Sequence, residues 1–434
     1  MLLLFTSATE QTAWPLFSDA PGSGFLCATL VYLFLVIYIY FQNRWLSRIH
    51  HCSNEKLRFV VNLQLLLFFA MSFFALGSLR LPDTMFSPFG QTTALVYTLL
   101  QYFTALVIGN IGSDNSPSCW KERLSKALTA TGFIIPFAIP FFLFSFVSEA
   151  EALIPFQSPT FENFTLLAIN ILTIIAAFIF LPPLAILCWG CSKLEDESRT
   201  APLDELCQKA GFKHAGFRIW NVMHDSITAA IVGIIAPFRY ILFTPKLLEL
   251  LPSRSLKAVV AHEIGHHRRH HLMIYPFILL GMIGIGSTIT MVLYPYFLKL
   301  APLIGISSSD PLLEAITLAS LFIIFALTMA VYFRLVFGYF SRLFERQADL
   351  FIFELHIPVE DMVDALDLLG TACGNIHNNP NWHHYSIQER IDFLHSAQRA
   401  PSAISRHHQK VKSSLLIYSI FLMLLTIYLI VKIA

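Results

Sequence analysis

The chain has 434 residues, of which 56% are hydrophobic and only 13% are charged, about half the charge density of soluble domains. This composition excludes a soluble single domain, and a formal charge of +1 excludes the strongly basic surface that binds nucleic acid. Seven cysteines, an odd and small number for this length, do not indicate a disulfide scaffold. We therefore expect a protein of the lipid bilayer with no nucleic-acid partner.

Apolar runs along the chain predict about eight membrane-spanning helices, because a span requires about 20 apolar residues. These runs are 25–41, 59–79, 92–111, 127–147, 165–189, 273–294, 312–337 and 415–433. Residues 1–5 are too short, and lack the basic flank, for a secretory signal, so we expect the first span to be retained.

The Lys and Arg side chains between these runs alternate between rich and poor segments. Segment 42–58 carries four and segment 80–91 carries one, whereas segment 190–272 carries eleven. Because positive charge gathers in cytoplasmic loops, we predict an N-terminus outside and both long polar segments, 190–272 and 338–414, in the cytosol. Which membrane the chain occupies, and its oligomeric state, do not follow from the sequence.

A metal-binding motif lies in the first of these polar segments. His262, Glu263 and His266 form HExxH within a stretch of helix-forming residues. Positions i and i+4 share one face of a helix, so both imidazoles can bind one Zn²⁺ and Glu263 can take a proton from a water bound there. The pattern predicts a catalytic zinc site with one ion per chain.

Two other interpretations of the histidines remain open at this point. HEIGHH at 262–267 and the overlapping run at 267–271 resemble the first and second histidine boxes of di-iron membrane lipid desaturases or hydroxylases, although both boxes would then share one helix. A zinc transporter is the other, although its metal motif would be expected inside a span. A third ligand on a distant cytosolic segment would favour hydrolysis.

The second polar segment offers such a ligand after two more predicted spans. Glu345 and Asp349 are again i and i+4, so a helix places both on one face. Glu345 could complete a His₂Glu site, and Asp349 could accept the outer N–H of a ligand imidazole, with Arg342 nearby in support. The alternative for Glu345 is an exposed carboxylate paired with Arg342 or Arg346.

Together, HEIGH and FERQADLF resemble the motifs of the membrane-integrated zinc metalloproteases of the type-I CAAX prenyl protease family, whose second motif is FExQADxF. The resemblance covers roughly residues 190–395. It implies a mainly α fold: a polytopic helical membrane bundle with a cytosolic zincin-like metalloprotease domain assembled from two segments. It also implies an endopeptidase for peptides or membrane-associated proteins; whether these are prenylated is left open.

The resemblance extends to residues that would contact substrate. His384 and Arg390 resemble the family's His, five residues, Arg element, so His384 would stabilise the oxyanion and Arg390 would contact substrate; His383 competes with His384. Residues 227–244 resemble the family's edge strand and hairpin, with Thr228, Ala229 and Ala230 as substrate contacts. Thr228 stands where the family usually has Asn, and the span at 415–433 is outside the family pattern.

We accordingly predict five parts of the chain. They are a five-span membrane region at 1–189, the first catalytic segment at 190–272, a two-span hairpin at 273–337, the second catalytic segment at 338–414 and a C-terminal span at 415–434.

Overall fold

The computed structural model describes residues 21–49, 54–72, 78, 85–114, 119–151, 153–154, 159–223, 226–300, 311–379 and 384–433. Contacts divide the chain into two compact units, Met1–Cys191 and Ser192–Ala434, and each is described by itself. The expectation for residues 1–5 concerns a part of the chain outside the described residues.

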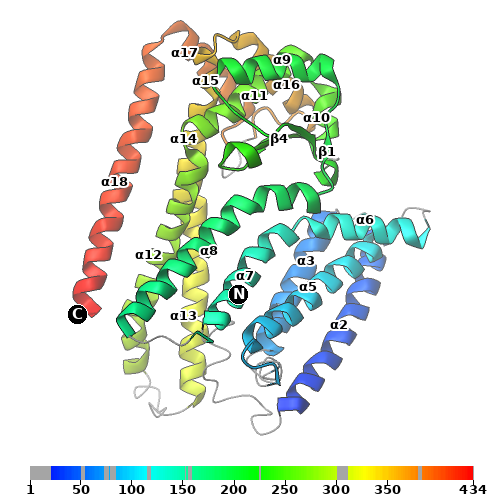
Figure 1. Ribbon diagram of the computed structural model, residues 1–434, viewed down its shortest axis with the longest axis vertical. Helices are drawn as coiled ribbons and strands as arrows, with labels where there is room; N and C mark the ends of the chain where they lie inside the picture. The colour runs from blue at the N-terminus through cyan, green and yellow to red at the C-terminus, as the bar shows by residue number, and fades with distance from the viewer. Residues whose placement is uncertain are drawn as a thin grey trace. The chain divides into compact units, whose positions relative to one another are not determined.

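The first unit is built from helices (Figure 1). They are α2 (Pro21–Ile49), α3 (Asn54–Ala70), α5 (Gly90–Ser113), α6 (Trp120–Gly132), α7 (Ile135–Glu151) and α8 (Pro159–Cys188). Helices α2 and α5 pack closely because α5 carries small residues at the contact: a Cβ on Gly112 would lie 2.7 Å from the carbonyl oxygen of Tyr40. Buried Ile39, Leu65 and Ala94 fill the space between α2, α3 and α5.

Six of the eight predicted spans coincide with helices that are long and apolar enough to cross a membrane, and the other two differ. The run at 127–147 is interrupted by a turn at Phe133 and Ile134, which leaves α7 with 17 residues, at the lower end of the range for a span. The run at 59–79 includes the end of α3, whose apolar part is Val60–Phe69, and residues 73–77 and 79 lie outside the described residues.

The second unit combines a small sheet with helices. Its elements are β1 (Ser192–Lys193), α9 (Glu197–Lys209), β2 (Phe217–Ile219), a 3₁₀ turn (Asn221–Met223), β3 (Ala229–Val232), a 3₁₀ turn (Ala236–Phe238), β4 (Tyr240–Phe243), α10 (Pro245–Leu250), α11 (Ser253–Arg268), α12 (His271–Leu300), α13 (Pro311–Tyr332), a π-helical turn (Phe333–Phe337), α14 (Gly338–Asp349), α15 (Phe351–Glu354), α16 (Val359–Ala372), α17 (Ile387–Arg399) and α18 (Ser402–Ile433).

The sheet has the strand order β1-β2-β4-β3, so β3 lies at an edge. Strands β3 and β4 are antiparallel, with Ala229 opposite Phe243 and Val232 opposite Tyr240, whereas β2 and β4 are parallel. Buried Ile241, Leu242 and Phe243 make β4 the central, apolar strand that packs into the core. The segment at 227–244 thus contains the edge strand and hairpin that the sequence indicated.

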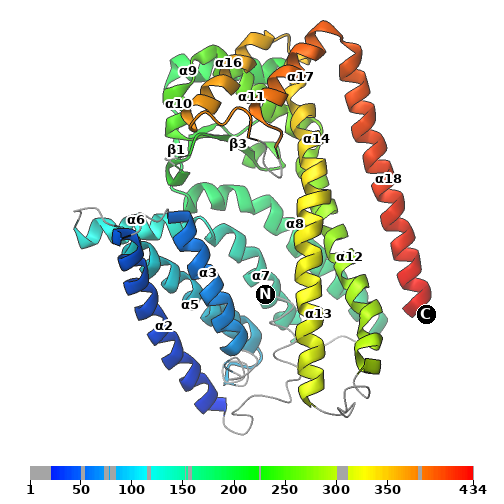
Figure 2. The ribbon, with the colours of Figure 1, turned by 180° about the vertical axis from the view of Figure 1, so that it is seen from behind.

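Helices α11 and α14 cross at very close range, which brings the two conspicuous motifs together. A Cβ on Gly265 would lie 2.9 Å from the carbonyl oxygen of Ala348 and from the Cβ of Phe351, so only glycine fits at this crossing. Phe340, Leu343 and Phe344 recur on one buried face of α14, the spacing of an amphipathic helix. In Figures 1 and 2, α12 and α13 run side by side, and α13 continues through the π-helical turn into α14.

Candidate metal centre

Helix α11 presents the HExxH side chains at the end of a buried helix. Leu256, Val260 and Ile264 anchor it in the core of the second unit, so its orientation is fixed by packing. The helix ends at Arg268, and His270 adopts a left-handed conformation with φ 59° before α12 begins. His262 and His266 therefore lie one turn apart on a rigid helix.

Glu345 on α14 faces these two imidazoles, and the three side chains form a group whose ligand atoms all lie within 4.8 Å of one another. The Nε2 atoms of the histidines are 3.2 Å apart, and they lie 3.3 and 3.7 Å from the carboxylate oxygens of Glu345. Donors on a tetrahedral zinc, at about 2.0–2.1 Å from the ion, are separated by about 3.3 Å. The donor set and its spacing thus fit one zinc ion.

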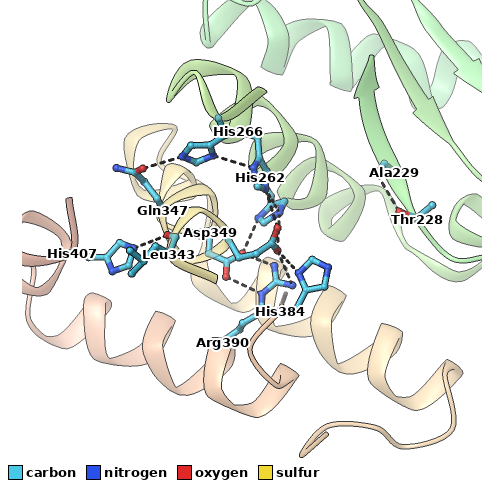
Figure 3. Close-up of polar contacts among 12 residues, drawn as sticks. Thr228, Ala229, His262, His266, Leu343, Gln347, Asp349, His384, Arg390 and His407 are labelled. Atoms are coloured by element: carbon cyan, nitrogen blue, oxygen red, sulfur yellow. Dashed lines mark hydrogen bonds and ion pairs between the residues drawn. The ribbon is translucent and has the colours of Figure 1, made fainter. Parts of the chain in front are cut away.

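Asp349 connects the candidate ligand His262 to Arg390 (Figure 3). Its Oδ1 accepts a hydrogen bond from Nδ1 of His262 at 2.8 Å, and its two oxygens accept from Arg390 at 2.6 and 2.9 Å. Asp349 is fully buried. Burial alone disfavours the charge of Arg390, but Asp349 and Glu345 outweigh it and raise the pKa of the guanidinium. These contacts fix the ring of His262 with Nε2 directed at Glu345.

Glu263 lines the same cavity as the three candidate ligands. Desolvation in this enclosed site raises the pKa of the Glu263 carboxyl, against the attraction of His262 and His266. A carboxylate with a raised pKa takes up a proton more readily than an exposed one, which suits a general base.

The His384 side chain contacts Glu345 from the segment that precedes α17. Its Nδ1 lies 3.1 Å from an oxygen of Glu345, and its side chain is 38% exposed, so it reaches both the candidate ligand and the cavity (Figure 3). Residue 383, the competing histidine, lies outside the described residues. Arg390 reaches inward because Ser386 and Glu389 form a capping box that starts α17 just before it.

Arg342 and Arg346 were the expected neighbours of Glu345 on its own helix. The alternative of an exposed, surface-paired Glu345 is wrong, because Glu345 is only 6% exposed. Arg346 instead stacks on Tyr385, with its guanidinium carbon 3.7 Å from the ring centre. Arg342 is half-buried one turn before Glu345, and the arginine that pairs with Asp349 is Arg390.

A cavity of about 490 Å³ joins the candidate metal centre to the edge strand β3. Thr228, Ala229 and Ala230 line it together with the metal-facing side chains. The backbone of Thr228 is bonded to Thr244, so by alternation Ala229 directs its backbone groups toward the open edge. Thr228 also donates its hydroxyl hydrogen to the carbonyl oxygen of Ala229 at 3.2 Å.

The remaining histidines of the run are not among the candidate ligands, although His267 and His271 also line the cavity of the candidate centre. His267 and His270 line a separate cavity of about 180 Å³ together with Arg239 and Arg268, and burial and Arg239 lower the pKa of His267 to about 4. His271 contacts the candidate ligand His266, and Gln347 in turn contacts His271. No role for Gln347 followed from the sequence. The overlap of HEIGHH with a second histidine box was the only signal for His271.

Comparisons with known proteins concern the family and the fold of the chain. Residues 193–397 match peptidase family M48. The fold is similar to the crystal structure of S. mikatae Ste24p, with a TM-score of 0.50 and 16% sequence identity over 86% of this chain and 98% of that chain. No curated protein matched the chain.

Proposed function

The chain carries a domain of peptidase family M48 on a Ste24p-like, multi-pass membrane fold, and on this premise we propose that it is a membrane zinc endopeptidase. The observation that carries the proposal is the group of His262, His266 and Glu345, whose donor spacing suits one zinc ion. Substrates would be peptides or membrane-associated proteins, and the catalytic unit would comprise segments 190–272 and 338–414, both on the cytosolic side.

The chain's own residues divide the proposed reaction between them. Zinc, when bound, supplies a Lewis acid that acidifies water and polarises the scissile carbonyl. Glu263, whose pKa is raised in the enclosed site, takes a proton from the attacking water and delivers it to the leaving amine. His384, at the cavity, donates a hydrogen bond to the developing oxyanion.

The edge strand β3 would hold the substrate by strand addition. Ala229 and Ala230 line the cavity, and small side chains there leave room for a peptide backbone to approach. Because the hydroxyl of Thr228 already bonds the carbonyl of Ala229, a bound peptide amide would share or replace that bond. Arg390 lies 3.7 Å from Glu345 and would act mainly by holding the carboxylates of Asp349 and Glu345 in place. It also lines the cavity, where its side chain would contact the substrate.

Metal content of the purified full chain in detergent tests the proposal directly. We expect one zinc per chain in the wild type and loss of zinc in Glu345→Ala, because a ligand is removed. Glu360→Ala is the matched control, since Glu360 lies on the exposed face of α16. Two irons per chain would favour the desaturase interpretation, and zinc binding indifferent to Glu345 would contradict the His₂Glu site.

Hydrolysis of an unprenylated and a prenylated peptide by the zinc-loaded chain tests the catalytic assignment. We expect Glu263→Gln to keep its zinc and lose turnover, because an amide cannot accept the proton. Turnover by this variant at the wild-type rate would contradict the role of Glu263. The ratio of rates on the two peptides shows whether a prenyl group is recognised.

A further inference from the structure

A continuous chain of polar contacts runs from the candidate ligand His266 to the C-terminal helix α18. The Nδ1 atoms of His266 and His271 are 3.0 Å apart, and Nε2 of His271 lies 3.0 Å from Oε1 of Gln347. The side-chain nitrogen of Gln347 lies 2.8 Å from Nδ1 of His408 on α18. Four side chains from α11, α12, α14 and α18 are therefore joined in a row (Figure 3 shows His266 and Gln347).

The direction of every hydrogen bond in this row follows from the ligand role of His266. An imidazole that binds a metal through Nε2 carries its proton on Nδ1, so it donates to Nδ1 of His271. Neutral His271 then carries its own proton on Nε2 and donates to Gln347, whose amide donates onward to His408. One tautomer of each ring satisfies the row from His266 to His408. The longer 3.5 Å contact between Arg269 and Nε2 of His408 is then donor against donor, so the 2.8 Å bond from Gln347 determines the tautomer of His408.

Burial holds the inner members of the row in place. His271 is 0% exposed and its ring stacks on Phe344, with ring centres 4.3 Å apart. Gln347 is 8% exposed. In such surroundings an unmade hydrogen bond is costly, so both side chains need the partners that they have.

Helix α18 is itself fixed against α12 to α14 at several points. His407, next to His408, donates to the backbone carbonyl of Leu343 at 2.9 Å. Further along, the hydroxyls of Tyr418 and Tyr332 are 2.6 Å apart, and both lie within hydrogen-bond distance of the carbonyl oxygen of Ile278. The outer end of the row is therefore held by the docking of α18.

We propose that His271, Gln347 and His408 are positioning residues that orient His266 for the metal, and that docking of α18 thereby regulates zinc affinity. This inference rests on the proposed function. His262 is oriented by the charged pair of Asp349 and Arg390, whereas His266 is oriented by this neutral row. The C-terminal helix thus has a role at the metal centre besides membrane anchoring.

The test is a double-mutant cycle on zinc affinity, measured by competition with a chromophoric chelator on the full chain in detergent. His271→Phe keeps the ring on Phe344 and removes both hydrogen bonds, so we expect zinc to bind about tenfold more weakly. Gln347→Leu and His408→Phe should each weaken binding severalfold. His408→Asn, whose side-chain oxygen can replace Nδ1 as the acceptor, should restore it.

Coupling between positions 347 and 408 distinguishes an effect on the orientation of His266 from a general effect on folding. We expect His408→Phe to weaken zinc binding in the wild-type background and to have no further effect when Gln347 is already Leu. Ser414→Ala, which removes the 2.8 Å contact between α18 and Tyr339, is the control and should bind zinc as the wild type does.

The outcomes distinguish this inference from the proposed function. Equal and additive effects of His408→Phe in both backgrounds, or wild-type affinity in His408→Phe, would overturn the coupling while the zinc site stands. A wild-type chain that binds no zinc would overturn the proposed function and this inference with it. If His408→Phe does not fold, the zinc affinities of Gln347→Leu and Gln347→Glu are compared instead. Glutamate keeps only the acceptor for His271, whereas leucine keeps neither contact. Tighter zinc binding by Gln347→Glu than by Gln347→Leu would support the row, and equal affinities would overturn it.

Discussion

Replacing Asp349 with Asn tests how the second motif supports the candidate metal centre. Asp349 accepts from His262 through Oδ1 and from Arg390 through both oxygens. An asparagine oxygen in the place of Oδ1 keeps two of these bonds, but the amide NH₂ then faces the Nε–H of Arg390, donor against donor. The opposite amide orientation confronts two donors and is worse.

The expected loss follows from the burial of the pair. Removing one partner of a buried ion pair costs about 3–5 kcal/mol. Arg390 keeps a second carboxylate, Glu345 at 3.7 Å, so we expect the lower end of that range. His262 keeps an acceptor of reduced strength, so zinc should bind about tenfold more weakly.

Thermal unfolding in detergent and chelator competition measure the two effects separately. Asp361→Asn is the matched control, because Asp361 faces the largely exposed Arg254 at 3.9 Å, and it should change stability by less than about 1 kcal/mol. If Asp349→Asn unfolds at the wild-type temperature and binds zinc with wild-type affinity, the contacts of Asp349 do not support the site.

Three further changes probe the packing, the helix start and the protonation of the site. Gly265→Ala should destabilise the chain by about 1–3 kcal/mol and weaken zinc binding, because its Cβ would meet α14 at 2.9 Å; Gly284→Ala, with open space around it, should be tolerated in the same unfolding measurement. Ser386→Ala removes the capping box of α17 and should lower stability by about 1 kcal/mol in thermal unfolding, and an unchanged transition would contradict the cap. Burial alone would lower the pKa of His266, but Glu345 outweighs it and raises the pKa, so protons compete with zinc from a higher pH than usual. Zinc affinity measured between pH 8 and 5 should therefore fall with acidification. An affinity independent of pH would refute competition between zinc and a proton for His266.

The sequence by itself determined the helical membrane character and the two halves of the candidate site. Apolar length predicts spans because every backbone group in lipid must be bonded within its own helix. At 127–147 it predicted one continuous helix where two meet, since a turn at Phe133 and Ile134 is not visible in hydropathy. HExxH and the pair at 345 and 349 were readable because i and i+4 always share a helix face.

Tertiary structure alone decided what lies beyond one helix face. Arg390 rather than Arg342 pairs with Asp349, because α17 and α14 meet in space and no spacing in the sequence records that meeting. Gln347, two residues from Glu345, points to a different side of α14 and so gave no signal, yet it meets His271. The left-handed residue His270 breaks the helix and resets its phase, so His271 could not be placed from the periodicity of α11. Helical periodicity is local, and it loses its predictive power wherever the chain turns or another helix supplies the partner.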